Sequence, residues 1–132
     1  MPTIFGSDKR DSVDVILDIT GSSSSSGVFA SLLNPFGVDC MIVGAKLNIT
    51  TQSTGAATCD IGTAATAISN DGLIDGLSVA ATGLFSNFLA ATAGTNGKPA
   101  KLWPATSYLT VAEATGDVDG LVARLYVSVI PL

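Results

Sequence analysis

Apolar and polar residues alternate with a period of two along much of this chain, and this alternation most limits how it can fold. In residues 12–20 every second residue is apolar, and residues 121–130 show the same pattern on one side. The apolar set of the first segment is Val13, Val15, Leu17 and Ile19. A period of two places one face of a β-strand in a core and the other face outside it.

Turn residues separate these segments at short intervals. Asn34-Pro35-Phe36-Gly37 is a favourable turn, because proline presets φ and glycine permits a positive φ. The longest strand signal covers 38–51, where Met41, Val43, Ala45, Leu47 and Ile49 are expected on one face and Gly44 marks a bulge. Further strands are expected at 28–33, 57–61, 79–88, 100–103 and 107–114.

The pattern therefore predicts an all-β protein of eight or nine short strands. At most one short helix is expected, near 71–78, with Asp71 at its N-terminus. An antiparallel β-sandwich of the jelly-roll kind, forming a single domain over 1–132, is the natural way to bury such strands. Residues 1–11 are expected to form an extended N-terminal arm.

The last predicted strand is apolar on both faces. Leu121, Ala123, Leu125, Val127 and Val129 form one face, and the other carries Val122, Tyr126 and Ile130. The outer face of an antiparallel sandwich is normally polar. We therefore expect a second layer over this strand, either a loop of the same chain or a neighbouring subunit.

The chain has few charged residues, and more of them are acidic than basic. Only 13% of the residues are charged while 47% are apolar, and the net charge is −5. The six basic residues form no stripe that would neutralise phosphates, so we expect no direct contact with nucleic acid. Residues 79–93 are too short and too polar to span a bilayer, so we expect no membrane association. In residues 1–10 the charges follow the apolar residues, so we expect no secretory signal and hence synthesis in a cytoplasm.

The residues needed for catalysis are missing. The chain has no histidine, and a serine or cysteine nucleophile needs a base beside it. Asp14 and Asp18 share a strand face but lie about 13 Å apart, beyond the usual separation of glycosidase carboxylates. We predict no catalytic residue and no cofactor. We expect Cys40 and Cys59 to be reduced core thiols, and the alternative that the sequence leaves open is a disulfide between them.

Two features permit a binding site. Asp117 and Asp119 offer two carboxylates to a cation such as Ca²⁺, but a β-turn explains the same residues, and we predict no metal site. Trp103 suits a ligand-stacking platform, although an isolated tryptophan in a sandwich more often fills the core or an interface.

Four parts of the chain together resemble decoration (cement) proteins of tailed-bacteriophage heads. They are the polar arm 1–11, the stretches 41–52 and 107–116, and the closing hydrophobic strand 120–130, within an acidic, histidine-free chain rich in Ala, Gly, Thr and Ser. The resemblance implies a non-catalytic jelly-roll-like subunit on the virion surface that binds the major capsid protein and stabilises the assembled head. It also implies a homo-oligomer, with a trimer favoured over a dimer.

Under this interpretation the partner interface is expected to use apolar and basic residues of the arm and of the strands. These are Ile4, Phe5, Lys9, Arg10, Phe36, Trp103, Val122, Tyr126 and Ile130. The alternative is a carbohydrate- or ligand-binding module of a phage fibre or cell-surface assembly. That alternative predicts an exposed aromatic residue beside acidic or amide groups.

Overall fold

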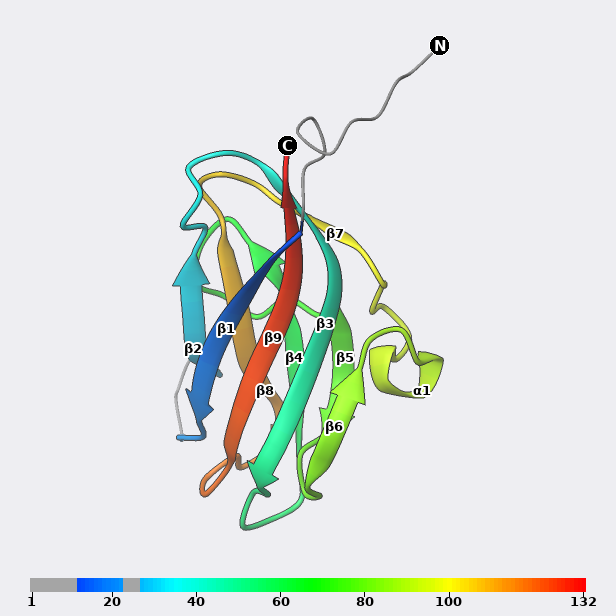
Figure 1. Ribbon diagram of the computed structural model, residues 1–132. Helices are drawn as coiled ribbons and strands as arrows, with labels where there is room; N and C mark the ends of the chain where they lie inside the picture. Colours follow the sequence, from blue (N-terminus) through cyan, green and yellow to red (C-terminus); the bar gives the residue numbers. More distant parts are fainter. Residues whose placement is uncertain (1–11, 23–26) are drawn as a thin grey trace.

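The described part of the protein, residues 12–22 and 27–132 of a computed structural model, is built almost entirely of β-strands (Figure 1). The prediction of an all-β sandwich is confirmed. The elements are β1 (Val13–Thr20), β2 (Val28–Leu33), β3 (Cys40–Thr51), β4 (Ala57–Ala64), β5 (Ile74–Ser78), β6 (Gly83–Ser86), α1 (Ala90–Ala93), β7 (Lys101–Trp103), β8 (Tyr108–Gly116) and β9 (Val122–Pro131).

The strands form two sheets with the order of a jelly roll. One sheet has the order β1-β9-β3-β6, with β7 also paired to β3, and the other has the order β2-β8-β4-β5. Neighbouring strands are antiparallel throughout. Without β7, this is the arrangement produced when one long antiparallel hairpin wraps around a core. Figure 1 shows the five-stranded sheet in front of the four-stranded sheet.

The hydrophobic core lies between the two sheets. Its largest members include Trp103, Ile42, Leu47, Ile61, Leu109 and Leu125, all at most 1% exposed. Trp103 Nε1 donates a hydrogen bond of 3.0 Å to the carbonyl oxygen of Ser107, and the ring of Phe36 packs edge-on against the indole. This bond satisfies the polar atom that a buried tryptophan must pair.

A bulge in β3 changes which residues face the core. The register to β9 shifts between Ile42 and Gly44, so Val43 is an extra residue. The predicted bulge is confirmed, but the predicted face is wrong for the first part of the strand. Cys40 and Ile42 are buried there, whereas Met41 and Val43 are only partly buried, because one inserted residue reverses the inward and outward positions.

The short helix predicted near 71–78 is a strand instead. Ile74 pairs with Ile61 and Leu77 pairs with Cys59, and both β5 side chains are buried. Gly76 has a φ of 72° and lies within the irregular part of this pairing, which brings two apolar residues three positions apart to the same face. The helix of the described chain, α1, lies further along, beside β5 and β6 (Figure 1).

The strand predicted at 79–88 is much shorter in the structure. Only Gly83–Ser86 forms a strand, β6, which pairs with the second half of β3 at the edge of the sheet. Phe85 points toward the core, whereas Leu84 is 64% exposed. The glycine and polar residues around this short strand leave too few apolar side chains for a buried central strand.

The outer face of the four-stranded sheet is partly covered by the chain itself. Thr110 and Ala112 of β8 point away from the core and yet are fully buried. Gly62, which pairs with Thr110, lies against Asn70, so a side chain at this position would collide with the loop between β4 and β5. On this sheet, a loop of the same chain supplies the second layer.

Candidate functional site

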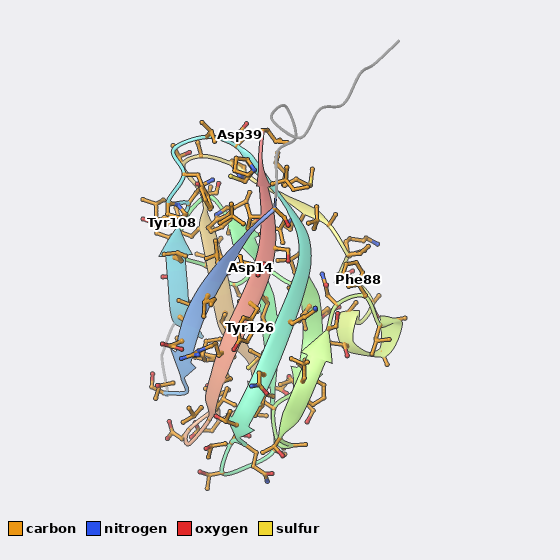
Figure 2. The ribbon with its side chains drawn as sticks, in the orientation of Figure 1. Asp14, Asp39, Phe88, Tyr108 and Tyr126 are labelled. Atoms are coloured by element: carbon orange, nitrogen blue, oxygen red, sulfur yellow. The ribbon has the colours of Figure 1, made fainter. Side chains whose placement is uncertain are left out.

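Among the described residues, no loop covers the outer face of the five-stranded sheet in the same way, and this face is the candidate functional site. β9 runs along its middle, between β1 and β3. Figure 2 shows Asp14 and Tyr126 on this face and Phe88 toward α1. We call this surface the open face. Its outward side chains are Asp14, Ile16 and Asp18 of β1, Val122, Arg124, Tyr126 and Ser128 of β9, Lys46 and Asn48 of β3, and Leu84 of β6.

Strand register sets the open face out in rows. Tyr126 pairs with Ile16 on one side and with Lys46 on the other. The next row has Arg124 between Asp18 and Asn48. The exposed acidic residues therefore lie along β1, and an exposed lysine and an amide lie along β3, with Tyr126 between the two columns.

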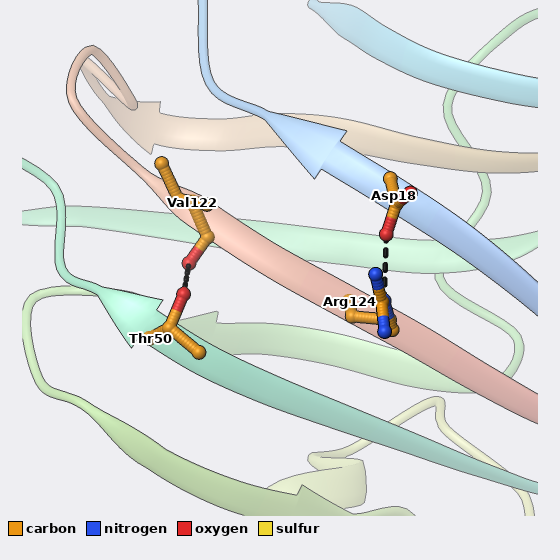
Figure 3. A network of polar contacts seen from close by, with 4 residues as sticks. All are labelled: Asp18, Thr50, Val122 and Arg124. Carbon is orange, nitrogen blue, oxygen red and sulfur yellow. Dashed lines mark hydrogen bonds and ion pairs between the residues drawn. The ribbon is translucent and has the colours of Figure 1, made fainter.

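Polar contacts hold parts of the open face in place (Figure 3). Arg124 Nε donates to Asp18 Oδ1 at 2.6 Å, and the hydrogen bond to this carboxylate raises the pKa of the guanidinium. Thr50 Oγ1 donates to the carbonyl oxygen of Val122 at 3.2 Å. Ser128 Oγ donates to Asp14 Oδ1 at 3.1 Å. The bonds from Arg124 and Ser128 orient the acidic residues of β1 toward β9.

Two shallow hollows meet at Tyr126. The first has a volume of about 260 Å³ and is lined by Asp18, Asn48, Thr50, Val122, Ala123, Arg124 and Tyr126. The second has a volume of about 220 Å³ and is lined by Asp14, Gly44, Lys46, Phe88, Tyr126 and Ser128. Each is smaller than the roughly 300 Å³ at which pockets for drug-sized ligands begin.

Large apolar side chains are exposed across the same region. Ile16 is 54% exposed, Val122 is 43% exposed and Phe88 is 62% exposed. Phe88 lies over Gly44 of β3, where a Cβ atom would be 3.0 Å from the ring. Exposed apolar side chains gathered on one sheet face, interspersed with charged and polar residues, are typical of an interaction site.

The predicted interface residues divide into three groups. Val122, Tyr126 and Ile130 lie on the outward side of β9, as the alternation predicted, with Val122 and Tyr126 on the open face. Trp103 is fully buried, so the structure removes it from any surface, and Phe36 is partly buried against it. The remaining four, Ile4, Phe5, Lys9 and Arg10, lie outside the described residues.

Sequence reasoning missed other residues of this surface. Ile16, Lys46 and Phe88 were not recognised as members of it. Ile16 breaks the alternation of β1, because its neighbours on the same side are Asp14 and Asp18. That exposed apolar residue between two carboxylates was the available signal for a contact surface.

Several acidic residues of the turns accept hydrogen bonds. Asp117 Oδ1 accepts a hydrogen bond of 3.0 Å from the amide of Asp119, as in an Asx turn. Asp75 and Asp71 accept hydrogen bonds from Asn96. Within residues 12–22 and 27–132 no three Cys, Asp or Glu side chains are grouped as a metal site.

Cys40 and Cys59 are free and buried, as predicted, and belong to different sheets. Burial raises the pKa of both thiols, that of Cys59 to about 12 with further help from Asp60 and Glu113. A thiol with a raised pKa is a poor nucleophile at neutral pH. Neither cysteine provides an activated nucleophile.

No family model, curated protein or solved structure matches this chain significantly. No helix in the described ranges is long and apolar enough to cross a membrane.

Proposed function

We propose that this protein is a structural subunit that acts through protein–protein contacts, as a decoration or cement subunit on the outer surface of a tailed-phage head. Its partners would be the major capsid protein and further copies of itself. The observation that carries this proposal is the open face, a sheet surface that residues 12–22 and 27–132 leave uncovered, with exposed apolar side chains in a chain that has few charges.

Three properties support a structural role over catalysis. The chain has no histidine, its two thiols are buried, and the carboxylates of the open face accept hydrogen bonds from Arg124 and Ser128. The jelly-roll order is also common in viral coat proteins, which is an analogy at the level of fold. A rigid sandwich that presents one broad face is suited to repeated, symmetric attachment, in which many weak contacts add up to strong binding.

The second candidate is a carbohydrate-binding module. It is favoured by Tyr126, an aromatic residue beside the carboxylate of Asp18 and the amide of Asn48 in a hollow of about 260 Å³. Jelly rolls also occur in lectin domains. The site predicted for this function at Trp103 is excluded by the burial of the indole.

The test uses heads of the phage whose genome encodes this chain, prepared from a strain that lacks the gene. The purified protein is added, and bound protein is measured by sedimentation of the heads together with the temperature at which they release DNA. We expect saturable binding at a fixed ratio to the major capsid protein and a higher release temperature. Heads that neither bind the protein nor gain stability would overturn the proposal.

A matched pair of variants locates the contact. Tyr126→Ala changes the open face, whereas Tyr108→Ala changes a similarly half-buried tyrosine on β8 of the other sheet (Figure 2). We expect Tyr126→Ala to lower head occupancy and Tyr108→Ala to leave it unchanged. Binding to a glycan array that Tyr126→Ala abolishes, without binding to heads, would favour the carbohydrate module instead.

A further inference from the structure

We propose that the open face binds the open face of a second copy of this chain, in a dimer whose two-fold axis runs parallel to β9. This inference rests on the proposed function only in treating the open face as a protein-binding surface. It assigns that surface to the contact between copies, so Tyr126→Ala lowers head occupancy by breaking the dimer that binds the head. It goes further by naming the occupant and the symmetry.

The charges of the open face are complementary to themselves under one particular rotation. Asp14 and Asp18 lie on β1, one strand to one side of β9, and Lys46 lies on β3, one strand to the other side. A two-fold axis along β9 exchanges the two sides, so β1 of each copy faces β3 of the other. Lys46 of one copy then lies opposite Ile16 of the other copy, at a position along the strands between Asp14 and Asp18 of that copy. Asn48 of one copy lies opposite Asp18 of the other.

The other in-plane two-fold axis, perpendicular to the strands, has the opposite effect. It places β1 against β1, so the exposed carboxylates of the two copies face each other. Like charges across an interface cost several kcal/mol. The charge pattern therefore selects the axis along β9 and disfavours its alternative.

Lys46 is available for this contact. Lys46 is exposed and forms no ion pair with the described residues of its own chain. The ion pair found among those residues joins Arg124 to Asp18. Arg124 itself leans toward β1 (Figure 3). Its counterpart leans to the opposite side, so the two guanidinium groups do not meet on the axis.

Apolar contacts and size also fit a second copy. The methylene stem of Lys46 would cover Ile16, which is 54% exposed, and Tyr126 would meet its own counterpart. A surface as long as the ten residues of β9, at about 3.4 Å per residue, and four strands wide, at about 4.8 Å per strand, has an area on the order of 600 Å². That is close to the roughly 800 Å² per partner of a stable interface.

Charge reversal tests the inference directly, with the molar mass of the full chain measured by sedimentation over a range of concentrations. Lys46→Glu and Asp14→Lys each set like charges against each other at two symmetric places. Since each contact is worth about tenfold in affinity, we expect each single variant to weaken the dimer about 100-fold. An equimolar mixture of the two variants should restore dimers, as should the double variant Asp14→Lys/Lys46→Glu.

Cysteine cross-linking gives a second, independent readout. Ser128 lies on β9 near the proposed axis, and sheets packed face to face are about 10 Å apart, which is too far for a direct disulfide. A short bismaleimide should therefore link Ser128→Cys into a covalent dimer, whereas Lys98→Cys, outside the open face, should not be linked. The native cysteines are buried and do not interfere. Thermal unfolding of every variant checks that it is folded.

The outcomes separate this inference from the proposed function. Loss of the dimer in both single variants with recovery in their mixture supports it. A wild-type chain that stays monomeric, or a trimer whose mass neither variant changes, overturns it. The head-binding experiment is read separately, because a monomer that binds and stabilises heads would preserve the proposed function while refuting the dimer.

Discussion

Asn34 and Trp103 lie 69 positions apart in the sequence, and Asn34 Nδ2 donates a hydrogen bond of 3.0 Å to the backbone carbonyl oxygen of Trp103. The same amide donates to Val38 at 2.9 Å, and its Oδ1 accepts from the amide of Phe36 at 2.8 Å. One buried side chain thus ties the turn after β2 to the end of β7, where the tryptophan closes the core.

Replacing this amide should destabilise the fold. We expect Asn34→Ala to lower the free energy of unfolding by about 2–3 kcal/mol, because buried backbone groups lose their partners. Guanidinium denaturation measures the change. The control is Asn96→Ala, which removes one exposed side-chain hydrogen bond, to Asp71, and should cost less than about 1 kcal/mol. Equal costs for the two variants would contradict the role given to burial.

A side chain at Gly62 should disrupt the loop that covers the four-stranded sheet. A Cβ atom there would lie 2.7 Å from the carbonyl oxygen of Asn70, a backbone atom that cannot turn aside. We expect Gly62→Ala to cost about 1–3 kcal/mol and to speed amide exchange in residues 65–72. Gly55→Ala is the matched control, because a Cβ atom at Gly55 meets nothing within 4 Å. A neutral Gly62→Ala would refute the close packing.

Phe85 and Phe88 should behave differently although only three positions separate them. Phe85 packs against the core, whereas Phe88 is 62% exposed on the open face. We expect Phe88→Ser to change the free energy of unfolding by less than about 0.5 kcal/mol and Phe85→Ser to lower it by about 2 kcal/mol or more. Thermal and denaturant unfolding decide between this outcome and similar costs at both positions. Phe88→Ser should also raise the ammonium sulfate concentration at which the protein precipitates.

The buried thiol of Cys59 should make stability depend on pH in the alkaline range. Its pKa is raised from 9.0 to about 12 in the folded chain, so the thiol ionises first in the unfolded chain. The stabilisation is complete below pH 9 and is lost as the pH rises from 9 toward 12, by about 1.4 kcal/mol per pH unit. Cys59→Ala should show a shallower decline between pH 9 and 10.5. Parallel declines for the two proteins would be inconsistent with the raised pKa.

The sequence predicted the strands well because the alternation of buried and exposed side chains within a strand is visible in consecutive residues. Alternation located β1, β3 and β9, and the turn residues 34–37 separated β2 from β3. It also identified Gly44 as a bulge. It failed to assign the faces of Met41 and Val43, since the inserted residue is defined by the register with β9, a strand far away in the chain.

The segment 71–78 illustrates a second limit. Ile74 and Leu77 are three positions apart, a spacing that suits one face of a helix. They reach one face of β5 through the irregular pairing at Gly76, and pairing with β4 supplies the hydrogen bonds that decide in favour of a strand. A local pattern of five residues does not distinguish the two outcomes.

By itself the sequence determined that the chain is an all-β sandwich with few charges, with buried thiols and with a last strand that is apolar on both faces. Only the tertiary structure decided that Trp103 is buried, that a loop covers one sheet, and that the open face joins Ile16, Tyr126 and Lys46 in one row. The physical reason is that the two faces of a strand differ in burial, which produces an alternation with a period of two among residues close in the sequence. Which strands pair within a sheet depends on contacts between distant segments, and these contacts leave no local pattern.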